Sequence, residues 1–360
     1  MVPEDPVSAT VFGVAVTASC ELPGAPMREL DVSDVGVWRE MVASSEPAVI
    51  RGLIRDWPAV AAGRHSATAL AAYLRRFDSG QPVDAIMCPP EVEGRVFYDA
   101  DMAGFNFVRN RLALSAVAEQ VLRYASFERA PSVAVQSALV SACLPGFCAA
   151  NRLSFLDDSI VPRIWLGTAI TTPTHLDEWN NIGGVLSGRR RFTLFPPEQI
   201  GNLYIGPLDF APTGAPMSLV PLHQPDFASF PRFRRALAAA VSAVLEPGDA
   251  IFIPPLWWHH VESLERFNVL VNYWWSPAPT IQTATDSGFD ALTLAILNLR
   301  RLPAPTRRAW RALLDHFVFD EPDVAVGHIP SHRHGMLGAL DGQTLARWRA
   351  YLAGKLRSGR

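Results

Sequence analysis

The segment TTPTHLDEWNN, residues 171–181, gathers side chains of the types that bind metal ions. His175 and Asp177 stand two positions apart. In extended backbone, side chains two residues apart project from the same face, so these two point together. Taken alone, the pair has an ordinary explanation, in which His175 donates to a turn carbonyl and Asp177 caps the loop. A third ligand from elsewhere in the chain decides between the two interpretations.

A candidate third ligand lies at the end of PGDAIFIPPLWWHH, residues 247–260. The Pro-Gly-Asp start indicates a turn and the apolar run after it indicates a strand, which leads to His259 and His260. Two histidines and one carboxylate on one side of a metal leave other coordination positions open, as in non-haem Fe(II) oxygenases. The tail histidines lack a carboxylate at strand spacing and are predicted to lie on the surface: His328, His332 and His334.

The elements that must position these residues divide the chain into three regions. Residues 1–130 are predicted to be mixed α/β, with strands at SEPAVIRGLI, VDAIMC and RVFYDA. Helices are expected at HSATALAAYLRRF, with Ser66 as N-cap, and at RLALSAVAEQVLRYA. Residues 131–276 carry short β-type runs between turns, which predicts an antiparallel sandwich or barrel, interrupted by a proline-rich insertion at 201–235. Residues 277–360 show helical patterns again.

Composition limits the classes of function. Of the 360 residues, 49% are hydrophobic, so the chain can bury a large core, and the net charge of −3 provides no general field for nucleic acid or anionic membranes. The apolar start SATVFGVAVTASC has no basic residue before it, which argues against export. We therefore expect a cytoplasmic protein without nucleic-acid or membrane partners. The cysteines match no zinc pattern and are expected to be reduced: Cys20, Cys88, Cys143 and Cys148.

Three longer motifs resemble the cupin-like branch of the JmjC-domain hydroxylases. They are TPTHLDEWNNIGGVLSGRRRFTLFPPEQ, PGDAIFIPPLWWHHVES and VNYWW. The resemblance is strong over roughly 130–276, and weaker at SEPAVIRGLIRDWPAV and in the helical tail. It implies a mainly β core with the double-stranded β-helix (jelly-roll, cupin-like) fold, and an activity that uses Fe(II), 2-oxoglutarate and O2.

The resemblance also implies roles for individual residues. His175, Asp177 and His259 match the iron ligands of the family, whereas His260 is expected to be structural. The 2-oxoglutarate pocket is matched by Thr172, Asn181, Arg190 and Asn272. Trp274 matches an aromatic residue at the mouth of the site, where we also expect Gln136 and Trp179 to meet the substrate.

Arg190 departs from the family pattern, in which a lysine usually holds the distal carboxylate of 2-oxoglutarate. Lys355 is the only lysine of this chain. A guanidinium group can replace the amine because it grips a carboxylate with two hydrogen bonds. Alternate residues of a strand face opposite sides, so the side chain that faces the pocket belongs either to Arg190 or to its neighbours Arg189 and Arg191.

We therefore expect an Fe(II)- and 2-oxoglutarate-dependent dioxygenase that hydroxylates a side chain of a peptide or protein. Alternatives remain: an oxygenase of a small metabolite, a cupin-type metal protein without 2-oxoglutarate turnover, a non-catalytic binding sandwich, and demethylation directed to histones or nucleic acid. FDALTLAILNLRRL, residues 289–302, is more apolar than one exposed helix tolerates. It predicts either packing on the core or a homodimer through the C-terminal helices, as in relatives of the family.

Overall fold

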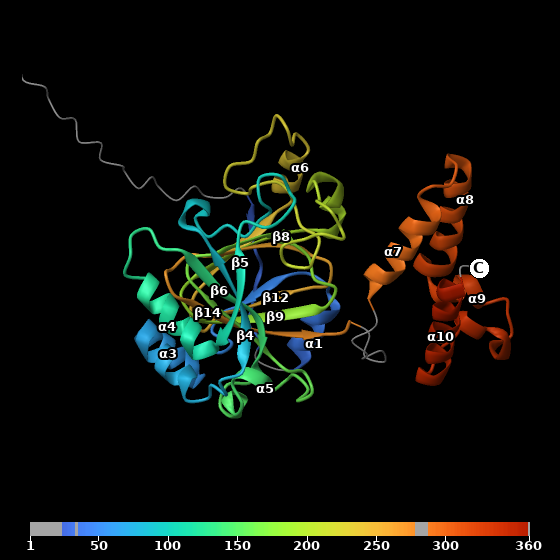
Figure 1. Cartoon of the computed structure of the whole chain (residues 1–360). Helices are drawn as coiled ribbons and strands as arrows, with labels where there is room; N and C mark the ends of the chain where they lie inside the picture. Colours follow the sequence, from blue (N-terminus) through green and yellow to red (C-terminus); the bar gives the residue numbers. More distant parts are fainter. Residues whose placement is uncertain (1–23, 33–34, 278–286, 359–360) are drawn as a thin grey trace, which may run out of the picture. The chain divides into compact units, whose positions relative to one another are not determined.

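The computed structural model describes residues 24–32, 35–277 and 287–358. Contacts divide the chain into two compact units, Met1–Trp275 and Ser276–Arg360, and Figure 1 shows the elements of each. Strands predicted as the β core and strands from the N-terminal region belong to the first unit. The apolar N-terminal segment and Cys20 lie outside the described residues.

Two β-sheets form the first unit. The order of the smaller sheet is β1 (Ala25–Pro26), β11 (Val241–Leu245), β10 (Arg190–Phe195), β13 (Trp258–Ser263) and β8 (Thr171–His175). The order of the larger sheet is β2 (Glu29–Leu30), β3 (Ala48–Ile50), β12 (Ala250–Ile253), β9 (Asn180–Ser187), β14 (Asn268–Trp275), β7 (Arg163–Gly167), β6 (Ser132–Leu139), β4 (Pro82–Cys88) and β5 (Val108–Ala113).

The strands from β7 to β14 have the topology of a jelly roll. In the larger sheet they follow the order β12-β9-β14-β7, and in the smaller sheet the order β11-β10-β13-β8, with antiparallel pairing throughout. The predicted double-stranded β-helix is therefore confirmed. Strands β2 and β3 of the N-terminal region extend the larger sheet beside β12. At the other edge β6, which belongs to the predicted core region, lies beside β7 and is followed by β4 and β5 of the N-terminal region.

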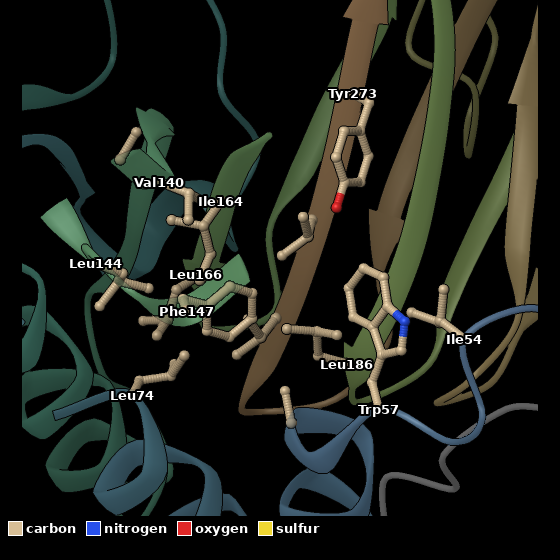
Figure 2. Close-up of a cluster of buried hydrophobic side chains, with 14 of the residues drawn as sticks. Ile54, Trp57, Leu74, Val140, Leu144, Phe147, Ile164, Leu166, Leu186 and Tyr273 are labelled. Carbon is tan, nitrogen blue, oxygen red and sulfur yellow. The ribbon is translucent and has the colours of Figure 1, made fainter. Parts of the chain in front are cut away.

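Helices cover the larger sheet and bury its apolar face. They are α1 (Val35–Ala43), α2 (Pro58–His65), α3 (Ala67–Arg75), α4 (Leu114–Tyr124) and the short α5 (Val140–Cys143). A further short helix, α6 (Phe233–Ala238), directly precedes strand β11 of the smaller sheet in the sequence. Figure 2 shows part of this core, where Leu74 of α3, Val140 of α5 and Ile164 of β7 gather around Phe147. A Cβ atom on Gly63 would stand 2.0 Å from the carbonyl oxygen of Leu186, so glycine allows α2 to lie against β9.

Most of the elements predicted in the N-terminal region are present. Ser66 caps α3, because its hydroxyl accepts a hydrogen bond from the Ala69 amide at 3.0 Å. As predicted, SEPAVIRGLI contains β3, and VDAIMC forms β4 together with the preceding Pro82. The strand predicted at RVFYDA is wrong, because Arg95 and Tyr98 form only isolated bridges to Thr171 and Phe105. Strand β5 was not predicted. Its last three residues, Arg111–Ala113, begin the segment predicted to be helical, and the helix α4 starts only at Leu114.

The second unit is helical, as predicted. It contains α7 (Gly288–Leu299), α8 (Ala304–Leu314) with a π-helical continuation at Asp315–Phe319, α9 (Pro322–Val326) and α10 (Gly342–Ser358). His328 and His332 are exposed, in agreement with prediction, whereas His334 is half-buried and places Nε2 2.9 Å from the Ile329 carbonyl oxygen. No helix among the described residues is long and apolar enough to cross a membrane.

Candidate metal centre

Two antiparallel strands bring the predicted ligands together. His175 is the last residue of β8, and its cross-strand neighbour on β13 is His259. Asp177 follows β8 by two residues and places Oδ2 3.6 Å from Nε2 of His259. The two imidazole rings have their centroids 4.2 Å apart. One ligand atom from each of the three residues lies within 4.8 Å of the others, so the group can hold one metal ion.

Backbone carbonyls orient both imidazoles. Nδ1 of His175 lies 2.8 Å from the Pro173 oxygen, and Nδ1 of His259 lies 3.0 Å from the Trp257 oxygen. Each Nδ1 then carries the proton, which leaves the Nε2 lone pair for a metal. Burial, together with the neighbouring His175, lowers the pKa of His259 to about 4. At neutral pH His259 is therefore an uncharged, ligand-competent imidazole.

A chain of side-chain amides orients the carboxylate. Asn181 Nδ2 donates to Asp177 Oδ2 at 3.4 Å, and Asn272 Nδ2 donates to Asn181 Oδ1 at 2.9 Å. Trp165 Nε1 closes the chain by donating to Asn272 Oδ1 at 2.8 Å. Outer hydrogen bonds of this kind fix the direction in which a carboxylate offers its lone pairs to a metal. Side chains from strands β7, β9 and β14 of the larger sheet thus orient Asp177, which follows strand β8 of the smaller sheet.

A cavity of about 290 Å³ opens beside the three candidate ligands, and residues of both sheets form its walls. This volume is near the lower end, about 300 Å³, of small-molecule sites. Its polar lining includes Thr172, Asn181, Arg190 and Asn272 in addition to the ligands. Its apolar lining includes Phe192, Ile251, Ile253, Val261 and Leu270.

Arg190 is the buried cation of this cavity. Its neighbours Arg189 and Arg191 are ion-paired with Glu265 and Glu262 at 2.8 and 3.8 Å. Arg190 is only 8% exposed, and within the described ranges no carboxylate forms an ion pair with it. Its Nε is buried without a hydrogen-bond partner. Burial lowers the pKa of Arg190 to about 10, so the group remains charged at neutral pH.

A family model described as "Cupin-like domain" matches residues 35–281. The chain belongs to this family. Its resemblance to the JmjC branch is confirmed by relatives that include a lysine-specific demethylase. JmjC enzymes use Fe(II) and 2-oxoglutarate, and the donor set of this cupin-like domain fits both: imidazole and carboxylate suit iron, and an unpaired guanidinium suits a carboxylate.

Three relatives illustrate the range of the similarity. HSPB1-associated protein 1 of Bos taurus is 33% identical over 149 residues, which cover 41% of this chain and 30% of the relative. Lysine-specific demethylase 8 of Xenopus tropicalis is 26% identical over 238 residues, 64% of this chain and 48% of the relative. tRNA wybutosine-synthesizing protein 5 of Danio rerio is 34% identical over 107 residues, 30% of each chain. The matches span less than half the length of these relatives.

The cupin-like domain gathers nearly all residues predicted for the site around one cavity. Gln136 and Trp274 line it, together with the ligands and the residues predicted for 2-oxoglutarate. Trp179 is half-buried and is not part of the lining. His260 is buried, and it lines a separate pocket.

Several residues at the cavity were not predicted. They are Asp84, Arg109, Ser137, Trp165, Thr213 and Ala215. Arg109 of β5 pairs with Asp84 of β4 at 2.5 Å and donates to the Pro212 oxygen at 3.1 Å, which ties the insertion to the edge of the larger sheet. No local pattern marks these residues, because they come from segments far apart in the sequence. Asp84 and Arg109 reach the cavity through the pairing of β4 with β5. Ser137 and Trp165 lie on the neighbouring strands β6 and β7, and Thr213 and Ala215 lie in the insertion.

Proposed function

We propose that this chain is an Fe(II)- and 2-oxoglutarate-dependent oxygenase. His175, Asp177 and His259 would hold the iron, and Arg190 would hold the distal carboxylate of 2-oxoglutarate. The observation that carries the proposal is the unpaired, buried guanidinium in the same cavity as the His-Asp-His group. An uncompensated buried charge costs several kcal/mol, roughly 3–5 where it has been measured, and a dicarboxylate would supply the missing counter-charge.

The residues divide the work of such a reaction. Bound iron would couple the decarboxylation of 2-oxoglutarate by O2 to the oxidation of a substrate C–H bond. Asn181 and Asn272 keep Asp177 in a fixed orientation through their hydrogen bonds. Thr172 and Arg190 bind and orient the cosubstrate from the polar wall. The apolar wall excludes water, which strengthens the charged contacts inside.

The proposed substrate is a side chain of a peptide or protein. Gln136 and Trp274 flank the cavity, and the guanidinium of Arg163 lies 5.5 Å from the Trp274 ring centre. Thr213 and Ala215 of the insertion form another part of the wall. An extended peptide suits such a surface, because backbone bonds supply affinity while one pocket selects a side chain. Of the relatives, HSPB1-associated protein 1 has a name that refers to another protein.

The test is turnover in a cell extract supplied with Fe(II), ascorbate and 2-oxoglutarate. We expect peptides that gain the mass of one oxygen, with stoichiometric succinate, in the presence of the wild-type chain and not of the Asp177→Ala variant. Oxygen gained only by small molecules would favour a metabolite oxygenase instead. Absence of succinate with every fraction would contradict the oxygenase proposal as a whole.

Lysine demethylation is the second candidate, favoured by the name of one relative, lysine-specific demethylase 8. Oxidation of an N-methyl C–H bond gives a hemiaminal that releases formaldehyde, so the peptide loses a methyl group and gains no oxygen. The same mass spectra, with a formaldehyde assay, distinguish the two reactions. Because one relative is named for tRNA, the RNA fraction of the extract should be assayed as well. The net charge of −3 leads us to expect no modification of the RNA.

A further inference from the structure

A second cluster of metal-binding side chains lies apart from the cavity. Strand β13 presents His259 to the cavity, whereas His260 lines a separate pocket of about 370 Å³ that also contains His223. Glu262 stands two residues after His260, at the spacing that directs both side chains to one face of a strand. Ligand atoms of His223, His260 and Glu262 all lie within 4.8 Å of one another.

Two members of this cluster are buried with polar atoms that lack partners. His260 is 4% exposed, and its Nε2 has no hydrogen-bond partner. Glu262 is 5% exposed, and its Oε2 has none. Buried polar atoms of native proteins are nearly always paired, so two orphans in one cluster indicate a missing ligand. The exposed His223 places Nε2 3.2 Å from Glu262 Oε1.

We propose that His223, His260 and Glu262 form a second metal site, for a divalent transition metal of the zinc type. Two imidazoles and one carboxylate are an established zinc donor set. With bonds of about 2.0–2.1 Å, tetrahedral coordination separates ligand atoms by roughly 3.4 Å, close to the distance between His223 and Glu262. His260 Nδ1 lies 3.5 Å from the Thr174 hydroxyl, so Nε2 is the nitrogen left for a metal.

Two arginines oppose the cation and limit its affinity. Arg191 Nη1 lies 3.8 Å from Glu262 Oε1. Arg95 lines the same pocket, with its guanidinium 3.9 Å from the Phe97 ring centre. Removing the charge of Arg191 should therefore tighten metal binding. A cluster that served only as an ion-pair network would show no such gain.

A metal here would fasten the proline-rich insertion to the β core. His223 belongs to the insertion, whereas His260 and Glu262 belong to β13. The same insertion supplies Thr213 and Ala215 to the cavity, and its Met217 forms a bridge with His175. The second site would thus hold one wall of the first. Metal binding at the second site requires no turnover, so it can be tested independently of the proposed function.

The experiment measures zinc in the chelator-stripped 360-residue chain, with the first site disabled by Asp177→Ala. We expect Asp177→Ala to retain one equivalent of Zn²⁺ that is lost when His223→Ala is added, by isothermal titration and elemental analysis. Gln224→Ala is the matched control, because this exposed neighbour lines the same pocket and contributes no zinc ligand. Co²⁺ in place of zinc should give the absorption of a tetrahedral site in Asp177→Ala and in the Gln224→Ala control, and not after His223→Ala is added.

A further variant tests the direction of the electrostatics. Adding Arg191→Met to Asp177→Ala should tighten zinc binding by about two- to fivefold, the effect of one partly exposed charge. Because His223 is exposed, its replacement should leave the circular dichroism spectrum unchanged. Equal zinc binding with and without His223, or no zinc bound by Asp177→Ala, would overturn the second site. Either result would leave the oxygenase proposal untouched.

Discussion

Replacing Arg190 by methionine should weaken the binding of 2-oxoglutarate by more than about 100-fold. A hydrogen bond to a charged group contributes about 1.5–3 kcal/mol, and a guanidinium can offer two of them to one carboxylate. The loss is then at least about 3 kcal/mol, and each 1.4 kcal/mol is tenfold in affinity. Arg190→Lys keeps the charge without the paired donors, so we expect a smaller loss, of about tenfold.

The same substitution should not destabilise the ligand-free protein. Arg190 is buried, and in the part of the chain that the structure describes no ion pair compensates its charge. Exchanging buried charges for apolar side chains of similar volume is often neutral or stabilising, by about 1–4 kcal/mol. A residue that served only the fold would show the opposite, a loss of stability with no change in ligand affinity.

The assay combines two measurements on the full chain loaded with Mn²⁺ in place of iron. Isothermal titration gives the affinity for 2-oxoglutarate, and the thermal midpoint with and without 2-oxoglutarate gives the stabilisation by ligand. Arg189→Met is the matched control, because Arg189 is exposed and ion-paired with Glu265. An affinity of Arg190→Met within threefold of wild type, or a greater loss of affinity in Arg189→Met, would show that Arg190 does not bind 2-oxoglutarate.

Further substitutions test the rest of the molecule. Asp177→Ala should lower iron affinity by more than about 100-fold in equilibrium dialysis with the β core intact, since its backbone oxygen still accepts from the Leu256 amide. Asn272→Ala should weaken metal binding by about 10–100-fold. An unchanged affinity would show that the chain of side-chain amides does not contribute to metal binding. Light scattering should find the full chain dimeric and a chain ending at Trp275 monomeric, and a monomeric full chain would exclude self-association. Burial raises the pKa of the Cys143 thiol to about 11, so at pH 8 only about one thiol in a thousand is ionised. Iodoacetamide should therefore label Cys143 only after unfolding, as peptide mass mapping would record.

Features with a local physical cause could be predicted from the amino-acid sequence. The H-x-D spacing directs two side chains to one face wherever the backbone is extended, and the cap at Ser66 needs only an amide three residues away. Short apolar runs between turns predicted the β core, and apolar residues at helical spacing predicted the helical tail. The strand predicted at RVFYDA does not form, because this segment has a strand-like composition but no continuous partner strand.

The tertiary structure alone decided what depends on the register between distant strands. Strand β9 contains polar residues and two glycines, so it has no strong β pattern of its own, yet it lies between β12 and β14 and is buried along its whole length. Among three adjacent arginines, the pairing of β10 with β11 and β13 turned Arg190 toward the cavity. The same register separated His259 from His260. A one-residue shift in pairing exchanges the two faces of a strand, and the packing of the whole core, rather than any local signal, selects between them.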